Sequence, residues 1–492
     1  MAPTVSHAPP EPHKTGEADA SAPLAWTVIA VTTIATLPRL TPIGNGDFFS
    51  FASVAERLSA GDRLYIDVWD NKDPYFYYLL SLAAGLGGWG YVLLELLWIG
   101  VAVAALIALA RSQGATPRWA LLIGWGIGPW CLLGVTYSGT MSVMPGVALA
   151  LATLAAAARQ RWTTVGVMLG VLVLLKVTLV PVAVAGALVF CVSDRVRAVL
   201  ATVTGGALAT MAGLAVLAVR GELFPFFTML SRNSEYAARM VDTGGLAGFL
   251  DHLALAFPAG LYPGERIALG AIVVGIIVAA VLPRSRPTPL VRCAAVTLAL
   301  SVVVLGLTAV WPHHAMLLAV PASLTLLALT TATAPRGTLR QGLGVAAYLV
   351  AAYLLGGAAP IGQILIKPAT AVQPLDQLTG ESPEAKSIAR DPDVETYARL
   401  GRNDRTAHAR GLDSLDLMCL NFQQYPFDPD STFDRTLACL PEADVVFVAD
   451  NFADQVDAPS YARFAEKARG ILARDFTCTP ADYGQKCLRS DR

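Results

Sequence analysis

Residues 91–110 read YVLLELLWIGVAVAALIALA, and Arg111 follows directly. The only charged residue in this segment is Glu95. A helix of about 20 apolar residues is long enough to cross the hydrocarbon core of a bilayer. The segment therefore predicts a membrane span that ends in a positively charged loop.

Similar apolar runs recur on both sides of this segment. Ten further spans are predicted, at residues 23–43, 119–135, 141–158, 163–176, 177–193, 198–218, 267–282, 290–310, 314–333 and 341–360. The runs at 163–176 and 177–193 are short for complete spans. We interpret them as half-helices that meet near Lys176, a break that needs surrounding protein to satisfy its backbone groups.

The composition supports a membrane protein and excludes several other classes. Hydrophobic residues make up 54% of the chain and charged residues 15%, whereas soluble domains carry about 25% charged residues. The net charge of −1 gives no general attraction to nucleic acid. The predicted fold is an α-helical polytopic membrane protein with a C-terminal external α/β domain. Its predicted parts are a disordered cytoplasmic tail (1–22), a transmembrane domain (23–363) and the external domain (364–492).

Paired arginines predict the orientation of these spans. Every second short loop carries such a pair: Arg111 and Arg118, Arg159 and Arg161, Arg195 and Arg197, Arg284 and Arg286, Arg336 and Arg340. Cytoplasmic loops are enriched in arginine and lysine. The pattern therefore predicts a multi-pass membrane protein with a cytoplasmic N-terminus and an external C-terminal domain. It requires that residues 75–90 form an interfacial helix rather than a span.

Cysteines and hydrophobic patterns support an external α/β domain. Four cysteines fall within it: Cys419, Cys439, Cys478 and Cys487. An even number in an oxidising compartment indicates two disulfides. The pairs between sequence neighbours, 419–439 and 478–487, are favoured among three possible connectivities, with four free buried thiols as the alternative. Residues 444–450 predict a buried strand, residues 458–473 a helix, and residues 476–488 a terminal hairpin.

The loop between the first two spans, residues 46–78, is the most informative part of the chain. Residues 48–60 place apolar side chains on one face, which predicts an amphipathic helix on the outer surface. Several charged residues follow, ending in the motif Asn71-Lys72-Asp73-Pro74-Tyr75 before an aromatic segment. No P-loop, Gly-rich dinucleotide turn, HExxH motif or zinc-type cysteine spacing is present anywhere in the chain.

This arrangement resembles the GT-C superfamily of polyprenyl-phosphate-sugar-dependent membrane glycosyltransferases, in particular the protein O-mannosyltransferase and aminoarabinose transferase-like branch. That branch has an acidic residue after the first span, an amphipathic helix ending in glycine, and a Lys-Pro-Pro-like motif with aromatic residues. The family often has Asp-Glu at its first acidic site, where this chain has Asp47-Phe48, and Asp73 replaces the first proline. No cofactor is required by the sequence, and a divalent cation stays open.

The resemblance implies an inverting transfer of a sugar from a lipid phosphate to an acceptor hydroxyl on the external face. A carboxylate must take the acceptor proton, and cations must stabilise the leaving phosphate. Asp47 is the candidate base, with a helix N-cap as the alternative. Lys72, Lys176, His313 and His314 are candidate ligands of the donor phosphate. Interfacial anchoring is the alternative for the lysines and the histidines.

Other polar residues near the predicted outer surface are candidates for supporting or acceptor-binding roles. They are Arg39, Asp67, Asp70, Asp73, Tyr75, Arg232, Glu235 and Tyr236. The expected partners are a polyprenyl-phosphate sugar of mannose or arabinose type, the lipid bilayer, and a glycan, lipid or protein acceptor, with no nucleic acid. The rival hypothesis is a transporter or flippase of lipid-linked glycans, which should show internal repeats and polar residues at mid-membrane.

Overall fold

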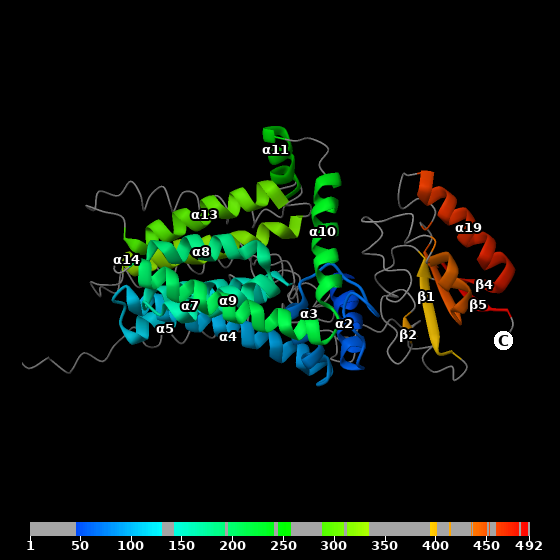
Figure 1. Ribbon diagram of the computed structural model, residues 1–492, viewed down its shortest axis with the longest axis horizontal. Coiled ribbons are helices and arrows are strands. Elements are labelled where there is room, and N and C mark those ends of the chain that lie inside the picture. The colour runs from blue at the N-terminus through cyan, green and yellow to red at the C-terminus, as the bar shows by residue number, and fades with distance from the viewer. Residues whose placement is uncertain are drawn as a thin grey trace, which may run out of the picture.

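The computed structural model describes residues 46–129, 142–191, 195–240, 245–256, 288–308, 312–333, 394–400, 413–414, 434, 436–449, 452, 459–481 and 484–490. Figure 1 shows a bundle of helices and, beyond it, a small sheet that carries one long helix. The amphipathic segment and the charged loop predicted from sequence belong to the bundle.

The bundle consists of helices at most of the predicted apolar runs and of further helices between these runs. They are α2 (Gly46–Ser59), α3 (Pro74–Ala84), α4 (Gly88–Ser112), α5 (Pro117–Pro129), α6 (Val143–Ala158), α7 (Trp162–Leu175), η3 (Val177–Leu179), α8 (Val180–Val189), α9 (Arg195–Val219), α10 (Leu223–Met240), α11 (Gly245–Ala256), α13 (Pro289–Thr308), η4 (Pro312–Leu318) and α14 (Ala319–Thr333). Within the described part of the chain, three helices are long and apolar enough to cross a membrane: Trp89–Ser112, Arg195–Val219 and Pro289–Thr308. The predicted spans at 23–43, 267–282 and 341–360 lie outside the described residues, so the count of eleven stays a prediction.

The predicted break between half-helices is confirmed. α7 ends at Leu175, and Lys176 adopts an extended conformation with φ −164° and ψ 81°. A single 3-10 turn follows, and α8 then begins with a proline in its first turn, where the missing N–H of proline costs no helical hydrogen bond. The chain therefore changes direction at Lys176 and places this residue between two short apolar helices.

Glycines bring α7 and α9 unusually close together. A Cβ atom added at Gly166 would lie 2.1 Å from the carbonyl oxygen of Thr202, and one at Gly205 would lie 2.5 Å from that of Thr163. Small residues allow helices to pack backbone against backbone, the usual way in which helices associate in a bilayer. The opposite face of α9 exposes Leu200, Val203 and other large apolar side chains, as a lipid-facing helix does.

The amphipathic helix after the first predicted span is also confirmed. α2 buries Phe51, Ala52, Ala55 and Leu58 on the predicted face. Phe51 packs edge-on against Phe76 of α3, with 5.2 Å between the ring centroids. α3 has 11 residues and is therefore about 16 Å long, roughly half of what a bilayer crossing needs. Its length agrees with an interfacial helix.

The C-terminal part of the chain is a mixed five-stranded sheet. Its strands are β1 (Thr396–Leu400), β2 (Asp413–Ser414), β3 (Val445–Ala449), β4 (Phe476–Ala481) and β5 (Gly484–Arg489), in the order β2-β1-β3-β5-β4. β1 runs parallel to β2 and β3, while β5 runs antiparallel to β3 and β4. The predicted strand at 444–450, helix at 458–473, now α19 (Pro459–Asp475), and terminal hairpin are confirmed. β1 and β2 were not predicted.

The core of this part lies between the sheet and α19. Every residue of β3 is buried, and its side chains point alternately to the two faces of the sheet. Val446 and Val448 join Phe464 and Leu472 of α19 in one cluster, whereas Phe447 packs on the other face. This two-sided burial explains why the strand reads as a continuous apolar run in the sequence.

One of the two predicted disulfides is confirmed. Cys478 and Cys487 stand opposite each other in the β4–β5 ladder, with 3.9 Å between their Cα atoms, and they are bonded. Cys439 is also disulfide-bonded, but Cys419 lies outside the described residues, so that pairing stays a prediction. Cys191 and Cys293 of the helical bundle are free thiols.

Candidate functional site

The loop between α2 and α3, residues 60–73, carries Lys72 at its end. The Lys72 ammonium donates to Oδ1 of Asn71 at 2.8 Å and lies 5.6 Å from the ring centroid of Phe51. Both partners are neutral. Among the ion pairs of the described residues none uses Lys72, so its positive charge is not cancelled by direct pairing. Such a cation suits an anionic ligand.

Asp73 joins this loop to the break at Lys176. Asp73 is the N-cap residue of α3 and is buried. It lies close enough to the break for the backbone at Val177 to affect its pKa. Burial raises the pKa of Asp73, while the positive charges of Lys176 and Lys72 and the Val177 N–H act in the opposite direction. Two lysines about a hundred positions apart in the sequence thus act on one carboxyl group.

Lys176 is fixed by contacts with α6. Its ammonium donates to Oγ of Ser142 at 3.4 Å, and Ser142 immediately precedes α6. A Cβ atom at Gly146 would lie 2.8 Å from Cβ of Lys176. Only glycine therefore lets α6 approach the break this closely. The structure thus places Lys72 and Lys176 near Asp73, and the binding of a phosphate there stays a prediction.

A buried carboxylate that the sequence analysis missed anchors the same loop. Glu222, at the corner between α9 and α10, is completely buried. It accepts the N–H of Leu64 at 2.9 Å and the hydroxyl of Tyr78, and it pairs with Nε of Arg220 at 2.8 Å. Arg220 in turn donates to the carbonyl of Asp62 at 3.0 Å. The signal in the sequence is the pair of charges in Arg220-Gly-Glu222, directly after a predicted span.

The other acidic candidates in the loop have structural partners. Asp67 pairs with Arg63, with 2.9 Å between Oδ2 and Nε, and hydrogen bonding to Arg63 lowers the pKa of Asp67. Asp70 is buried and accepts the backbone N–H of Lys72 at 3.0 Å. Tyr75 is half-buried, and its hydroxyl lies where a Cβ atom of Gly213 in α9 would be. Asp70 and Tyr75 are thus neighbours of Lys72 and Asp73, whereas the Asp67 carboxylate forms an ion pair with Arg63.

Several predicted residues cannot be placed at the level of side chains. Asp47 lies in the first turn of α2, which begins at Gly46, but its side chain is outside the described part of the chain. The same holds for the side chains of His313 in η4 and of Glu235 and Tyr236 in α10, and for the whole of Arg39. The structure does place the side chains of two further candidates, Arg232 on α10 and His314 in η4, and both are half-buried. The roles of all these residues stay predictions.

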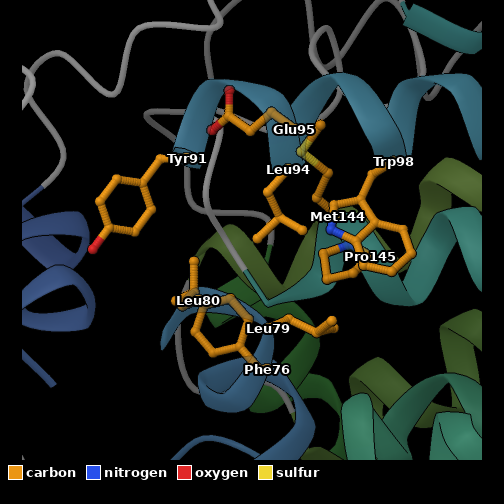
Figure 2. A pocket seen from close by; sticks show the side chains of 9 residues that line it. All are labelled: Phe76, Leu79, Leu80, Tyr91, Leu94, Glu95, Trp98, Met144 and Pro145. Atoms are coloured by element: carbon orange, nitrogen blue, oxygen red, sulfur yellow. The ribbon is translucent and has the colours of Figure 1, made fainter. Parts of the chain in front are cut away.

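A largely apolar pocket lies between α3, α4 and α6 (Figure 2). The residues that line it are Phe76, Leu79, Leu80, Tyr91, Leu94, Glu95, Trp98, Met144 and Pro145. Phe76 also packs against Phe51, the ring beneath the Lys72 ammonium. Met144 and Pro145 precede Gly146, the residue that meets Lys176. One residue therefore separates the pocket lining from each lysine, Phe51 from Lys72 and Gly146 from Lys176.

The described residues contain no group of three or more His, Cys, Asp or Glu side chains placed to hold a metal ion.

Comparison with known proteins gives similarity in structure but not in sequence. No model of a known protein family matches the chain, and no curated protein matches it. The crystal structure of ArnT from Cupriavidus metallidurans bound to undecaprenyl phosphate matches with a TM-score of 0.57 and 15% identity, covering 95% of this chain and 98% of that one. The apo state of the same ArnT matches with a TM-score of 0.55, 16% identity and the same coverage. The chain therefore shares the fold of this ArnT over nearly the whole of both chains.

Proposed function

We propose that this protein is a membrane glycosyltransferase that takes a sugar from a polyprenyl-phosphate donor. The observation that carries the proposal is that Lys72, in the loop before α3, and Lys176, at the break after α7, both lie near the buried carboxyl group of Asp73. It occurs in a fold similar to that of a protein crystallised with undecaprenyl phosphate. A lipid phosphate supplies the anionic head that two lysines would bind.

The chemistry is a single displacement at the anomeric carbon. The acceptor hydroxyl oxygen forms the new bond, the bond from the anomeric carbon to the phosphate oxygen breaks, and the configuration inverts. Lys72 binds the leaving phosphate, and Lys176 supports it from the break between α7 and α8. Both lysines stabilise the negative charge that develops on the departing oxygen. Asp47 takes the proton of the acceptor hydroxyl.

The donor sugar is of mannose or arabinose type, and the acceptor is a glycan, lipid or protein of the cell envelope. We place the reaction on the external face of a bacterial plasma membrane. The C-terminal domain lies on the same side, where it binds the acceptor or a partner protein. Paired arginines in alternate loops support this orientation, as does the disulfide between Cys478 and Cys487.

The proposal is tested with the purified full chain in nanodiscs against a panel of polyprenyl-phosphate sugars. We expect one donor to release polyprenyl phosphate in step with glycosylation of an acceptor. Asp47→Asn should lower turnover by roughly 10²–10⁴-fold, the usual contribution of a positioned base, and should leave donor binding intact. Lys72→Ala should weaken donor binding as well as turnover, because the phosphate is charged in both ground and transition states. Movement of intact lipid-linked glycan between leaflets, with no sugar transfer from any donor, would instead establish the rival flippase function.

A further inference from the structure

Side chains hold the main-chain polar groups on both sides of Lys72. Its own N–H donates to Oδ1 of Asp70 at 3.0 Å, and its own carbonyl accepts the Tyr65 hydroxyl at 2.6 Å. The preceding carbonyl, that of Asn71, accepts Nδ2 of Asn233 at 2.9 Å. In an exposed loop these groups would usually bond to water. Here three hydrogen bonds fix the orientation of the two peptide planes from which the Lys72 side chain projects.

Tyr65 is held in an unusual conformation that aims its hydroxyl at Lys72. Its φ is +65°, a region that residues other than glycine rarely occupy. Strain of this kind persists where the surroundings determine it, often at ligand sites. The Tyr65 N–H donates to the carbonyl of Val68 at 2.6 Å, and its buried ring lies 6.1 Å from the ring of Phe226. A glycine would adopt this backbone conformation more easily but would supply neither the hydroxyl nor the ring.

Asn233 and Phe226 both belong to α10. This helix therefore contacts the loop of residues 60–73 at two points. One is a hydrogen bond to Asn71, and the other is the contact between the rings of Phe226 and Tyr65. Glu222, which directly precedes α10, supplies a third attachment through Leu64. Figure 1 shows α10 beside α2 and α3 at one end of the bundle. Any displacement of α10 acts directly on the peptides that carry Lys72.

We propose that Tyr65 and Asn233 are positioning residues that preset the Lys72 ammonium for the phosphate of the lipid donor. The proposal rests on the phosphate-binding role proposed above for Lys72. Neither residue needs to touch the donor. Both reduce the freedom of the loop before the ligand arrives, so that less entropy is lost on binding.

A double-mutant cycle separates positioning from general structural support. The measured quantity is the affinity of the full chain in nanodiscs for a polyprenyl phosphate without sugar. Tyr65→Phe removes the hydroxyl and keeps the ring against Phe226, and Asn233→Ala removes the amide. Each should weaken binding by about threefold to tenfold, the usual effect of one lost hydrogen bond. In the Lys72→Ala background each should change the affinity by less than about twofold, because the group that they position is gone.

The control is Thr228→Ala, a change on the same helix. The Thr228 hydroxyl is exposed and bonds only within α10, to the carbonyl of Phe224 at 3.1 Å, so the affinity should not change. Equal weakening by Tyr65→Phe with and without Lys72 would overturn the inference, since the effect would then be structural. If Tyr65→Phe and Asn233→Ala both leave the affinity unchanged while Lys72→Ala weakens it, the positioning role is overturned but the proposed phosphate site stands. An unchanged affinity in Lys72→Ala itself would overturn the proposed phosphate site as well.

Discussion

Lys72 and Asp73 are neighbours in the sequence, but the fold gives them opposite surroundings. Lys72 is half-buried and has neutral partners, an amide and an aromatic ring. Asp73 is buried, and burial raises its pKa above the usual value of an aspartate. A carboxylate at this position opposes an anionic ligand of Lys72, whereas a neutral carboxyl group does not. With Lys72 in its proposed role, the protonation state of Asp73 should control how strongly the site attracts a phosphate.

The expected pH dependence follows from the sign of this shift. As the pH falls through the raised pKa of Asp73, its negative charge is lost and affinity for polyprenyl phosphate should rise. Asp73→Asn removes the charge at every pH, so it should bind more tightly than wild type above the raised pKa of Asp73 and equally well below it. The ratio of the two affinities is the quantity to follow, because the titration of the phosphate itself, at about pH 6, affects both proteins alike. Measuring affinity between pH 5 and pH 8 checks this, with Asp251→Asn on the exposed side of α11 as the matched control. Parallel profiles for Asp73→Asn and the wild type would show that Asp73 has no part in phosphate binding.

The residue-scale features of the site could be predicted only in part. The motif around Lys72 and the isolated Lys176 could be found because such charges are rare in apolar surroundings. The contacts made by Glu222 and Asn233 could not, because their partners Leu64 and Asn71 lie 158 and 162 positions away. No local pattern encodes such pairings. The left-handed conformation of Tyr65 also has no signal, since no glycine marks it.

At the scale of elements, the close approach of α7 and α9 supports the break that presents Lys176. Gly166 and Gly205 let the two backbones meet, and α7 ends nine residues after Gly166. The helices were predictable because their apolar runs are long and continuous. The parallel pairing of β1 with β2 and β3 was not, because short strands carry little periodicity and their partners are distant in the sequence.

Gly166→Ala should therefore be much more damaging than an ordinary helix substitution. The added Cβ atom would lie 2.1 Å from the carbonyl oxygen of Thr202, so α7 and α9 must separate. Overpacking of this kind typically costs about 1–3 kcal/mol. The matched control is Gly100→Ala in α4, where an added Cβ atom meets nothing within 4 Å. Thermal unfolding in detergent should show a lower midpoint for Gly166→Ala only. Equal midpoints for the two variants would mean that the α7–α9 contact is looser than described.

At the scale of the whole molecule, the proposed reaction needs the site and the C-terminal domain on the same side of the membrane. The arginine pairs and the Cys478–Cys487 bond point to an external C-terminal domain by independent physical arguments. One concerns charge during membrane insertion, and the other concerns the redox state of the compartment. Both arguments predict the same side for the C-terminal domain, and this prediction can be tested directly.

Labelling with a membrane-impermeant thiol reagent provides that test. In a background with Cys131, Cys191 and Cys293 changed to serine, two single cysteines are introduced on opposite predicted sides. Arg463→Cys lies on the exposed face of α19, and Ser112→Cys lies exposed at the end of α4 in a predicted cytoplasmic loop. In intact bacterial cells we expect labelling at position 463 alone, and after permeabilisation at both positions. Labelling at position 112 in intact cells would reverse the predicted orientation and remove the Lys72 site from the external face, because the predicted crossing by α4 separates that site from Ser112.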